Sequence, residues 1–188
     1  MTYCLSQENS VIEMPPQRMV FFFATDSENR GYAMDFELDD ALGYLIETTE
    51  QTLKLGLRRR FREHGFDITP YQWVILYRLW ERDGRRQSEL ADDSVRDRPT
   101  MTRILDVMQR KELVTRQKDE HDRRSYRVFL TERGASLESK LPPIAAEYLQ
   151  EFTNGIDQSD IDVAKKVLKT IRMNASREIE LKTPTTSR

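Results

Sequence analysis

Apolar residues recur along most of this chain at the spacing of amphipathic helices. From Phe36 onward they are separated by three, four or seven positions, which predicts one long helix that stops near His64 and Gly65. A second helix is expected to begin at Thr69, because threonine is a good N-cap and Pro70 fits the first turn. Its predicted buried stripe consists of Trp73, Leu76, Tyr77 and Trp80.

Two short helices and a hairpin are predicted next. Ser88 is the expected N-cap of the first short helix and Asp97 that of the second, which has Pro99 in its first turn. Residues 114–118 and 126–130 mix apolar and polar positions in strand-like alternation, so they predict a hairpin with a long, charged tip. The second short helix has an apolar stripe of Met101, Ile104, Leu105 and Met108, and its other face carries Thr100, Arg103, Val107 and Arg110.

The C-terminal part of the chain is predicted to form two further helices. Thr131 is the expected cap of the first, which we expect to be bent or interrupted at Pro142 and Pro143 because proline lacks a helical donor. The second is expected to begin around Ser159 and to place Val163, Val167, Leu168 and Ile171 inside. Residues 1–35 are predicted to be an irregular extension, and residues 182–188 a C-terminal tail.

Composition narrows the class of protein. Charged residues make up 33% of the chain and aromatic residues 9%, a balance that favours a folded protein over a disordered one. The net charge of −2 argues against coating nucleic acid by overall attraction. Residues 85–133 nevertheless contain 13 Lys and Arg against 10 Asp and Glu, so the basic excess is local.

Several kinds of site are not expected. Cys4 is the only cysteine, which excludes an intrachain disulfide, and His64 and His121 do not complete a zinc-binding pattern, so no metal or cofactor is predicted. The longest apolar run, residues 19–24, is too short to cross a membrane, and we expect a cytoplasmic protein with no membrane partner. The chain has neither a glycine-rich phosphate loop nor a nucleophile elbow, which argues against an enzyme.

The order of the central elements is typical of a winged helix-turn-helix. Two short helices are joined by a tight turn, the second carries Thr100 and Arg103 on its polar face, and a charged hairpin follows. A DNA major groove admits one α-helix, while basic side chains and hydroxyls bind phosphates. We therefore predict a mainly α fold with a two-stranded β wing.

One particular family shares these motifs. The chain contains Asp-Arg-Pro-Thr-Met-Thr-Arg-Ile-Leu-Asp at 97–106, Leu113-Val114, Asp122-Arg123-Arg124, and Leu-Thr-Glu-Arg-Gly at 130–134. With these residues it resembles the multiple-antibiotic-resistance-regulator (MarR) family from about residue 36 to residue 180. The Asp-Arg-Arg tip followed by Leu-Thr-x-x-Gly is specific when it comes after such a helix.

The resemblance implies a homodimeric regulator of transcription that binds double-stranded DNA. It implies a winged helix-turn-helix at 66–134 within a domain at 36–181, and a helical dimerisation region at 36–65 and 135–181. It also implies an inverted-repeat operator and repression relieved by a small aromatic or anionic ligand. The groove-facing residues would be Arg98, Pro99, Thr100, Thr102 and Arg103; Arg123 would enter the minor groove, and Asp122 and Arg124 would stiffen the wing.

Plainer interpretations of these residues stay open. Arg98 and Arg103 also suit a solvated helix face, and Arg123 and Arg124 also suit pairing with acidic neighbours. A winged helix that contacts protein or RNA, without an operator, is the alternative function. The family commonly has glycine where this chain has Glu112, which costs about 1 kcal/mol if that residue is left-handed. The candidate ligand-binding residues are Tyr44, Arg58, Arg62, Trp73, Tyr77 and Tyr148. The aromatic residues among them also suit an ordinary core.

Overall fold

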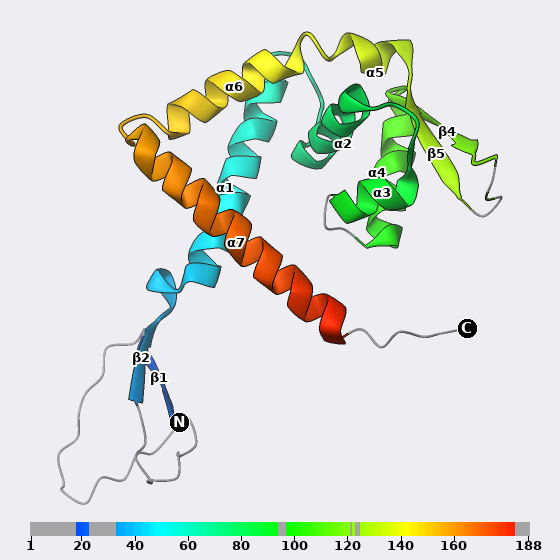
Figure 1. Cartoon of the computed structure of the whole chain (residues 1–188). Coiled ribbons are helices and arrows are strands. Elements are labelled where there is room, and N and C mark those ends of the chain that lie inside the picture. The colour runs from blue at the N-terminus through cyan, green and yellow to red at the C-terminus, as the bar shows by residue number, and fades with distance from the viewer. Residues whose placement is uncertain (1–17, 23–32, 94–96, 121, 123–124, 183–188) are drawn as a thin grey trace, which may run out of the picture. The chain divides into compact units, whose positions relative to one another are not determined.

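The computed structural model describes residues 18–22, 33–93, 97–120, 122 and 125–182, and Figure 1 shows them as helices joined to two small sheets. The chain divides into two units, residues 1–56 and residues 57–188. Within the described ranges no helix is long and apolar enough to cross a membrane.

The first unit contains a β-hairpin that was not expected from the sequence pattern. Strand β1 (Arg18–Phe22) pairs with β2 (Ala33–Glu37) in antiparallel register. The prediction of an irregular segment was therefore wrong for these residues, since valine and phenylalanine favour strands even without a helical period. Phe36 belongs to β2, and a short 3₁₀ helix (Leu38–Asp40) precedes α1 (Leu42–Glu63), so the long helix begins later than predicted.

The predicted end of the first helix and the predicted start of the second are confirmed. Gly65 has a φ of +81° after α1, a left-handed conformation in which its N–H donates to the Arg62 carbonyl at 3.0 Å. Thr69 caps α2 (Pro70–Glu81), with reciprocal bonds between Thr69 and Gln72 that form a capping box. In α2, Leu76 is buried but Tyr77 is 45% exposed, so the stripe predicted for this helix was wrong at Tyr77.

The next elements form the predicted winged unit, with one strand more than expected. Helices α3 (Gln87–Asp93) and α4 (Arg98–Arg110) are followed by β4 (Val114–Lys118) and β5 (Tyr126–Leu130), at the predicted positions. Strand β3 (Arg85–Arg86) pairs with β5, giving the order β3-β5-β4. Ser88 lies inside α3 rather than capping it, because the Glu89 carboxylate accepts the Arg86 N–H at 2.8 Å and α3 begins at Gln87.

The hydrophobic core of the second unit lies beneath α4 and connects it to the neighbouring elements. The predicted stripe of α4 is confirmed, since Met101, Leu105 and Met108 are fully buried and Ile104 packs against them. These residues lie against side chains of α2, the hairpin and the start of α6. The largest fully buried hydrophobic side chains outside α4 are Phe61, Ile75, Leu76, Leu79, Leu90, Leu113, Val128 and Leu141.

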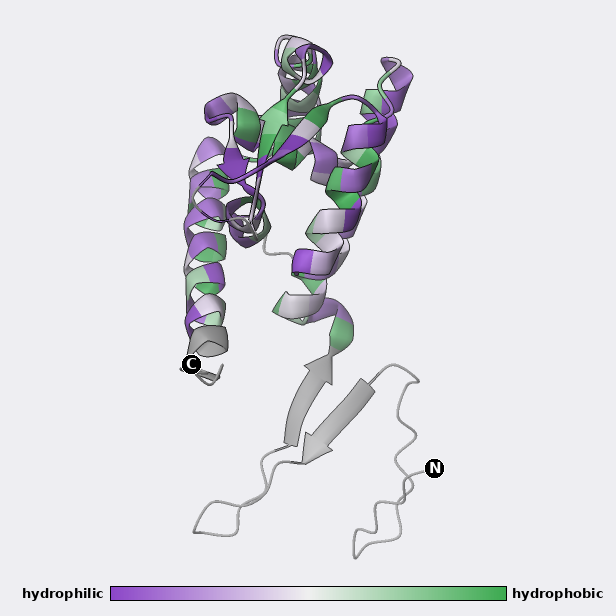
Figure 2. Ribbon diagram, turned by 90° about the vertical axis from the view of Figure 1, so that its right-hand side faces the viewer, coloured by the Kyte–Doolittle hydropathy of each residue, from purple (hydrophilic) through white to green (hydrophobic). Residues whose placement is uncertain are grey.

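The C-terminal helices leave much apolar surface exposed in a single chain. Helix α5 (Glu132–Ser136) ends before a turn at 137–140, and α6 (Leu141–Phe152) carries its prolines in the first turn. The interruption thus precedes the prolines, which are tolerated at a helix start. Helix α7 (Gln158–Lys182) exposes Val163, Val167 and Leu168, which were predicted to be inside. Figure 2 shows hydrophobic bands recurring along this otherwise hydrophilic helix.

A close backbone contact joins α4, the wing and α5. Glu112 is left-handed, with a φ of +56°, and it turns the chain from α4 into Leu113 and β4. The Leu113 carbonyl accepts the Thr131 N–H at 3.1 Å, and a Cβ placed on Gly134 would lie 2.0 Å from that carbonyl oxygen. Trp80 of α2 donates to the Gly134 carbonyl at 3.1 Å. Glycine is therefore required at position 134 by space rather than by its own torsion angles.

Replacing Gly134 by alanine is expected to destabilise the protein. The added methyl group meets backbone atoms of Leu113, which cannot rotate away, and overpacking of this kind costs on the order of 1–3 kcal/mol or more. Gly43→Ala is the matched control, because a Cβ at Gly43 of α1 meets no atom within 4 Å. Urea denaturation should show a loss for the first variant and no loss for the second; equal stabilities would contradict the steric role of Gly134.

Candidate nucleic-acid interface

The start of α4 is fixed by its N-cap. The Asp97 carboxylate accepts the Thr100 backbone N–H and the Thr100 hydroxyl, both at 2.8 Å. These two hydrogen bonds hold the pKa of Asp97 below its ordinary value, with a smaller contribution from the positive charge of Arg103. The charged cap therefore persists at neutral pH and is lost only as the pH falls through the lowered pKa.

The capped end of α4 exposes most of the residues predicted to face a groove. Arg98, Pro99 and Arg103 are exposed and Thr100 is half-buried, while Met101 points into the core. The guanidinium groups of Arg98 and Arg103 thus lie on the surface of a helix whose opposite face is buried. This arrangement is what a helix needs in order to enter a groove and still remain attached to its domain.

Thr102 occupies a different position from its predicted neighbours. Its hydroxyl donates to the Arg98 carbonyl at 3.0 Å and accepts from the Gln87 side-chain amide at 2.7 Å. The second bond ties the first residue of α3 to α4. No signal in the sequence indicated Gln87, because its partner lies 15 positions away across the helix-turn-helix.

A buried carboxylate connects the wing to β3. Asp119 directly follows β4, and its side chain is 0% exposed. It accepts from Arg127 Nε at 2.8 Å, from Arg86 Nε at 3.2 Å and from the Asp122 backbone N–H at 3.2 Å. None of Asp119, Arg86 and Arg127 was predicted as a site residue, although Asp119 was weighed as a partner for wing arginines.

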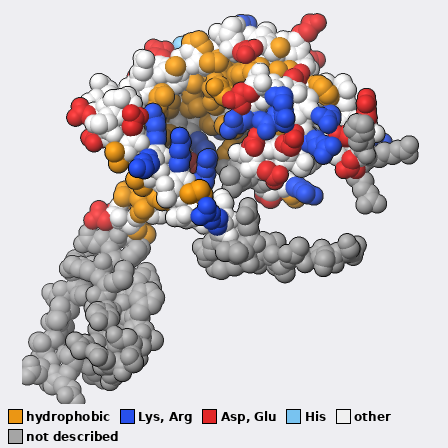
Figure 3. All heavy atoms as spheres, in the orientation of Figure 1, with side chains coloured by type: hydrophobic (Ala, Val, Ile, Leu, Met, Phe, Trp, Pro, Cys, Tyr) orange, Lys and Arg blue, Asp and Glu red, His pale blue; other side chains and the backbone are white. Residues whose placement is uncertain are grey.

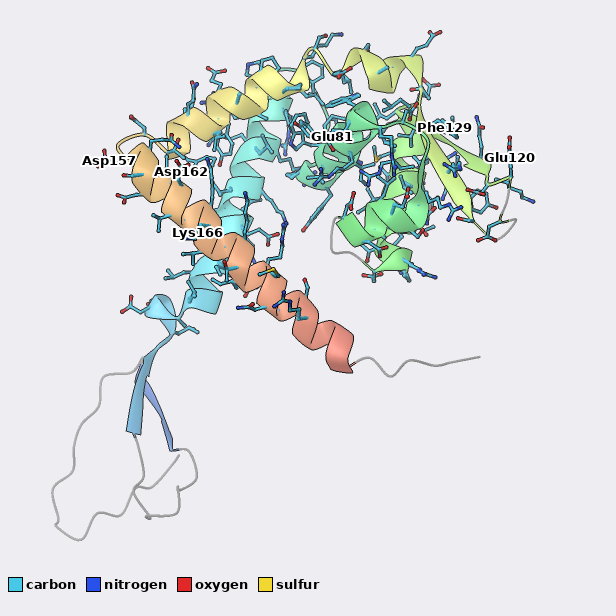
Figure 4. All side chains as sticks on the ribbon, viewed as in Figure 1. Glu81, Glu120, Phe129, Asp157, Asp162 and Lys166 are labelled. Atoms are coloured by element: carbon cyan, nitrogen blue, oxygen red, sulfur yellow. The ribbon has the colours of Figure 1, made fainter. Side chains whose placement is uncertain are left out.

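The wing tip is described only in part. Figure 4 shows Glu120 near the far end of the hairpin and Phe129 close to its base. Asp122 is exposed, and its backbone carbonyl accepts the Ser125 N–H at 2.8 Å, which closes the turn. Arg123 and Arg124, predicted to contact DNA, lie outside the described residues, so the predicted Asp122–Arg124 pair stays a prediction.

The surface around these elements carries both signs of charge. Figure 3 shows Lys and Arg side chains interspersed with Asp and Glu over the face formed by α3, α4 and the hairpin. Arg85 pairs with Asp93 at 2.6 Å, and Arg82 pairs with Glu89 at 3.2 Å. The pKa of Glu89 is lowered, chiefly by the backbone N–H of Arg86 and then by nearby arginines. The exposed arginines of α4 thus sit beside a region where several charges are paired internally.

The predicted ligand-binding residues are spread over several elements. Trp73 packs between Phe61, Tyr77 and Trp80, with ring centroids 5.6–5.7 Å apart, and Tyr148 packs on Phe152 at 5.4 Å. Arg58 and Arg62 are exposed, and with Lys111, whose hydrogen bond is the main cause, they lower the pKa of Asp67. Tyr44 lies on the part of α1 that belongs to the first unit.

No metal centre is assembled by the residues that the structure describes, where no three His, Cys, Asp or Glu side chains gather. What the described surface offers is an exposed, basic helix start with a hairpin beside it. Arg116 of β4 joins the two, since it pairs with Asp106 and Gln109 of α4. Such a surface is suited to binding a polyanion with a groove, which is the shape and charge of double-stranded DNA.

Comparison with known proteins points in the same direction. The model of the MarR family matches residues 68–126. A MarR transcriptional regulator from Methanosarcina mazei Go1 is 30% identical, with a TM-score of 0.64, over 72% of this chain and 96% of that chain. The S. aureus MepR–DNA complex is 25% identical, with a TM-score of 0.64, over 71% and 98% of the two chains. The uncharacterized HTH-type transcriptional regulator YsmB of Bacillus subtilis is 28% identical over 71% of this chain and 92% of its own.

Proposed function

Because this chain belongs to the MarR family of transcriptional regulators, we propose that it represses transcription as a homodimer bound to an inverted-repeat operator in double-stranded DNA. Regulators of this family bind DNA and are not enzymes. The observation that carries the proposal is the capped start of α4, where Arg98, Pro99 and Arg103 are exposed while the opposite stripe is buried.

The start of α4 is proposed to read bases in the major groove. Arg98, Pro99, Thr100 and Arg103 reach the surface there, and an arginine that donates two bonds to guanine is the commonest specific contact to a base. Thr102 has a part in holding α3 against α4 through Gln87. Arg123 is proposed to enter the minor groove, with Asp122 and Arg124 stiffening the wing, on the resemblance alone.

Arg103→Ala is expected to weaken operator binding by about 1–3 kcal/mol and to relax the preference at one base position. Arg110→Ala is the matched control, because Arg110 is also exposed but lies in the last turn of α4. The measurement is selection of bound fragments from random duplex DNA, followed by titration of the selected sequence. Wild-type protein that shows neither sequence preference nor salt dependence would instead favour the alternative of a protein-interaction or RNA-binding module.

Dimerisation is proposed to use the apolar surface that the C-terminal helices expose. Val167 is 46% exposed and Leu168 48% exposed on α7, and Leu149 of α6 is 51% exposed. Isolated exposed apolar residues are ordinary, but a stripe along one long helix marks an interaction surface. A twofold-symmetric dimer would place two winged units on successive grooves, so that the half-sites lie about 10–11 base pairs apart.

Val167→Glu is expected to convert the dimer to a monomer, since it places an unpaired carboxylate in an apolar interface. Ser176→Glu is the control, because Ser176 is also exposed on α7. It lies nine residues after Val167, about two and a half turns, and therefore faces the opposite side of the helix. Sedimentation should show a monomer only for the first variant. A wild-type monomer at micromolar concentration would contradict the proposed dimer.

Release by a small aromatic or anionic ligand completes the proposal. It is supported by an aromatic ring that reaches the surface on α2 and by exposed arginines on α1: Tyr77 is 45% exposed and packs on Trp73, and Arg58 and Arg62 are exposed. By linkage, such a ligand binds the free dimer more tightly than the DNA-bound dimer. Each tenfold loss of operator affinity requires about 1.4 kcal/mol of that difference.

Aromatic carboxylates are expected to quench tryptophan fluorescence and to lower operator affinity together. The chain has only two tryptophans, Trp73 and Trp80, and both lie on α2. Arg58→Gln should weaken the effect, whereas Arg59→Gln, in the same run but paired with Glu63 at 3.4 Å, should not. Quenching without any change in operator affinity would leave a binding site but remove the regulatory role.

A further inference from the structure

Two arginines that face each other across the sheet share one carboxylate. Arg86 of β3 stands directly opposite Arg127 of β5 in the antiparallel register. Like charges in such a pair repel. Asp119 relieves this repulsion, since its buried carboxylate accepts from Nε of both arginines. Among these three described side chains, one negative charge stands against two positive ones.

Each arginine side chain is partly exposed. The side chains of Arg86 and Arg127 are 42% and 39% exposed, whereas that of Asp119 is 0% exposed. The bonds to Asp119 use the Nε atoms, and one terminal nitrogen of Arg127 donates to the Gly84 carbonyl at 2.9 Å. The anchored Nε atoms fix the direction of both planar groups, and within the described part of the chain terminal N–H donors are left for another acceptor.

This arginine pair is linked both to the recognition helix and to the wing. Gln87, the residue after Arg86, bonds Thr102 of α4 at 2.7 Å. Asp119, on the other side, accepts the Asp122 backbone N–H of the wing turn at 3.2 Å. A helix in the major groove and a wing in the adjacent minor groove are separated by one sugar-phosphate strand. The arginine pair stands in the part of the protein that this strand must cross.

We propose that Arg86 and Arg127, held by Asp119, form a binding site for a DNA backbone phosphate between α4 and the wing. The inference deepens the proposed function and rests on it. Phosphate suits this site because guanidinium groups donate parallel hydrogen bonds to its oxygens. Such an interaction positions the protein on the duplex and carries no sequence information.

Arg86→Gln and Arg127→Gln are the variants that test this site. Each is expected to lower the affinity for the operator and for an unrelated duplex by the same factor, leaving their ratio unchanged. The slope of log affinity against log salt concentration should become shallower by about 0.9 for each phosphate that the variant no longer neutralises. Arg133→Gln is the control. Arg133 of α5 is 64% exposed, and its ion-pair partner is Glu112, at 4.0 Å, rather than Asp119.

Three further variants separate phosphate binding from a purely structural role. Arg86→Lys and Arg127→Lys keep the charge and should keep most of the salt slope, even where they reduce affinity. Asp119→Asn removes the anchor but neither cation, so it should reduce affinity with a slope near that of the wild type. Thermal denaturation shows whether each variant is folded. If Arg127→Gln is unfolded, Arg86→Gln alone is enough to test the site.

The outcomes distinguish this inference from the proposed function. Wild-type protein with a steep salt slope and glutamine variants with an unchanged slope would overturn the phosphate site and leave operator binding intact. The same holds if the glutamine variants lose operator affinity only in parallel with their stability. Wild-type protein that binds no duplex would overturn the proposed function itself.

Discussion

The contact between Gly134 and the Leu113 carbonyl is the constraint on which the winged unit depends. A Cβ at Gly134 would lie 2.0 Å from that oxygen, so α5 can begin where it does only because the residue has no side chain. The same carbonyl accepts the Thr131 N–H, and the left-handed Glu112 brings Leu113 into place. One backbone contact therefore joins α4, the wing and α5, the first of the C-terminal helices.

Polar interactions extend this rigid arrangement to the surface that we propose for DNA. Trp80 attaches α2 to Gly134, Gln87 attaches α3 to α4, and Asp119 attaches the wing to β3. Buried carboxylates are costly unless they are paired, and the two arginines of Asp119 supply that pairing. The energetic requirement of one buried charge thus holds two cations beside it, Arg86 of β3 and Arg127 of the wing strand β5.

The C-terminal helices are built on a different principle. Many of their apolar residues are not buried within one chain, as the exposed Val163 and Leu168 of α7 show. Arg60 and Glu151 form an ion pair that joins the end of α1 to α6 within the second unit. An exposed apolar stripe of this kind is typical of an interaction surface, which is why we propose a dimer rather than a single winged unit.

The sequence alone determined the elements whose causes are local, and only the tertiary structure decided the contacts between distant residues. The caps Thr69 and Asp97, the α4 stripe and the two wing strands depend on residues a few positions apart, and all were predicted. Strand β3 has two residues, too few to show any alternation, and it exists because β5 is available to pair with it. Arg86 and Asp119 lie 33 positions apart, and nothing in the spacing of either residue indicates that the carboxylate is buried between two arginines. The exposure of Tyr77 was missed for the same reason, because helical periodicity defines a face but not the surface that covers it.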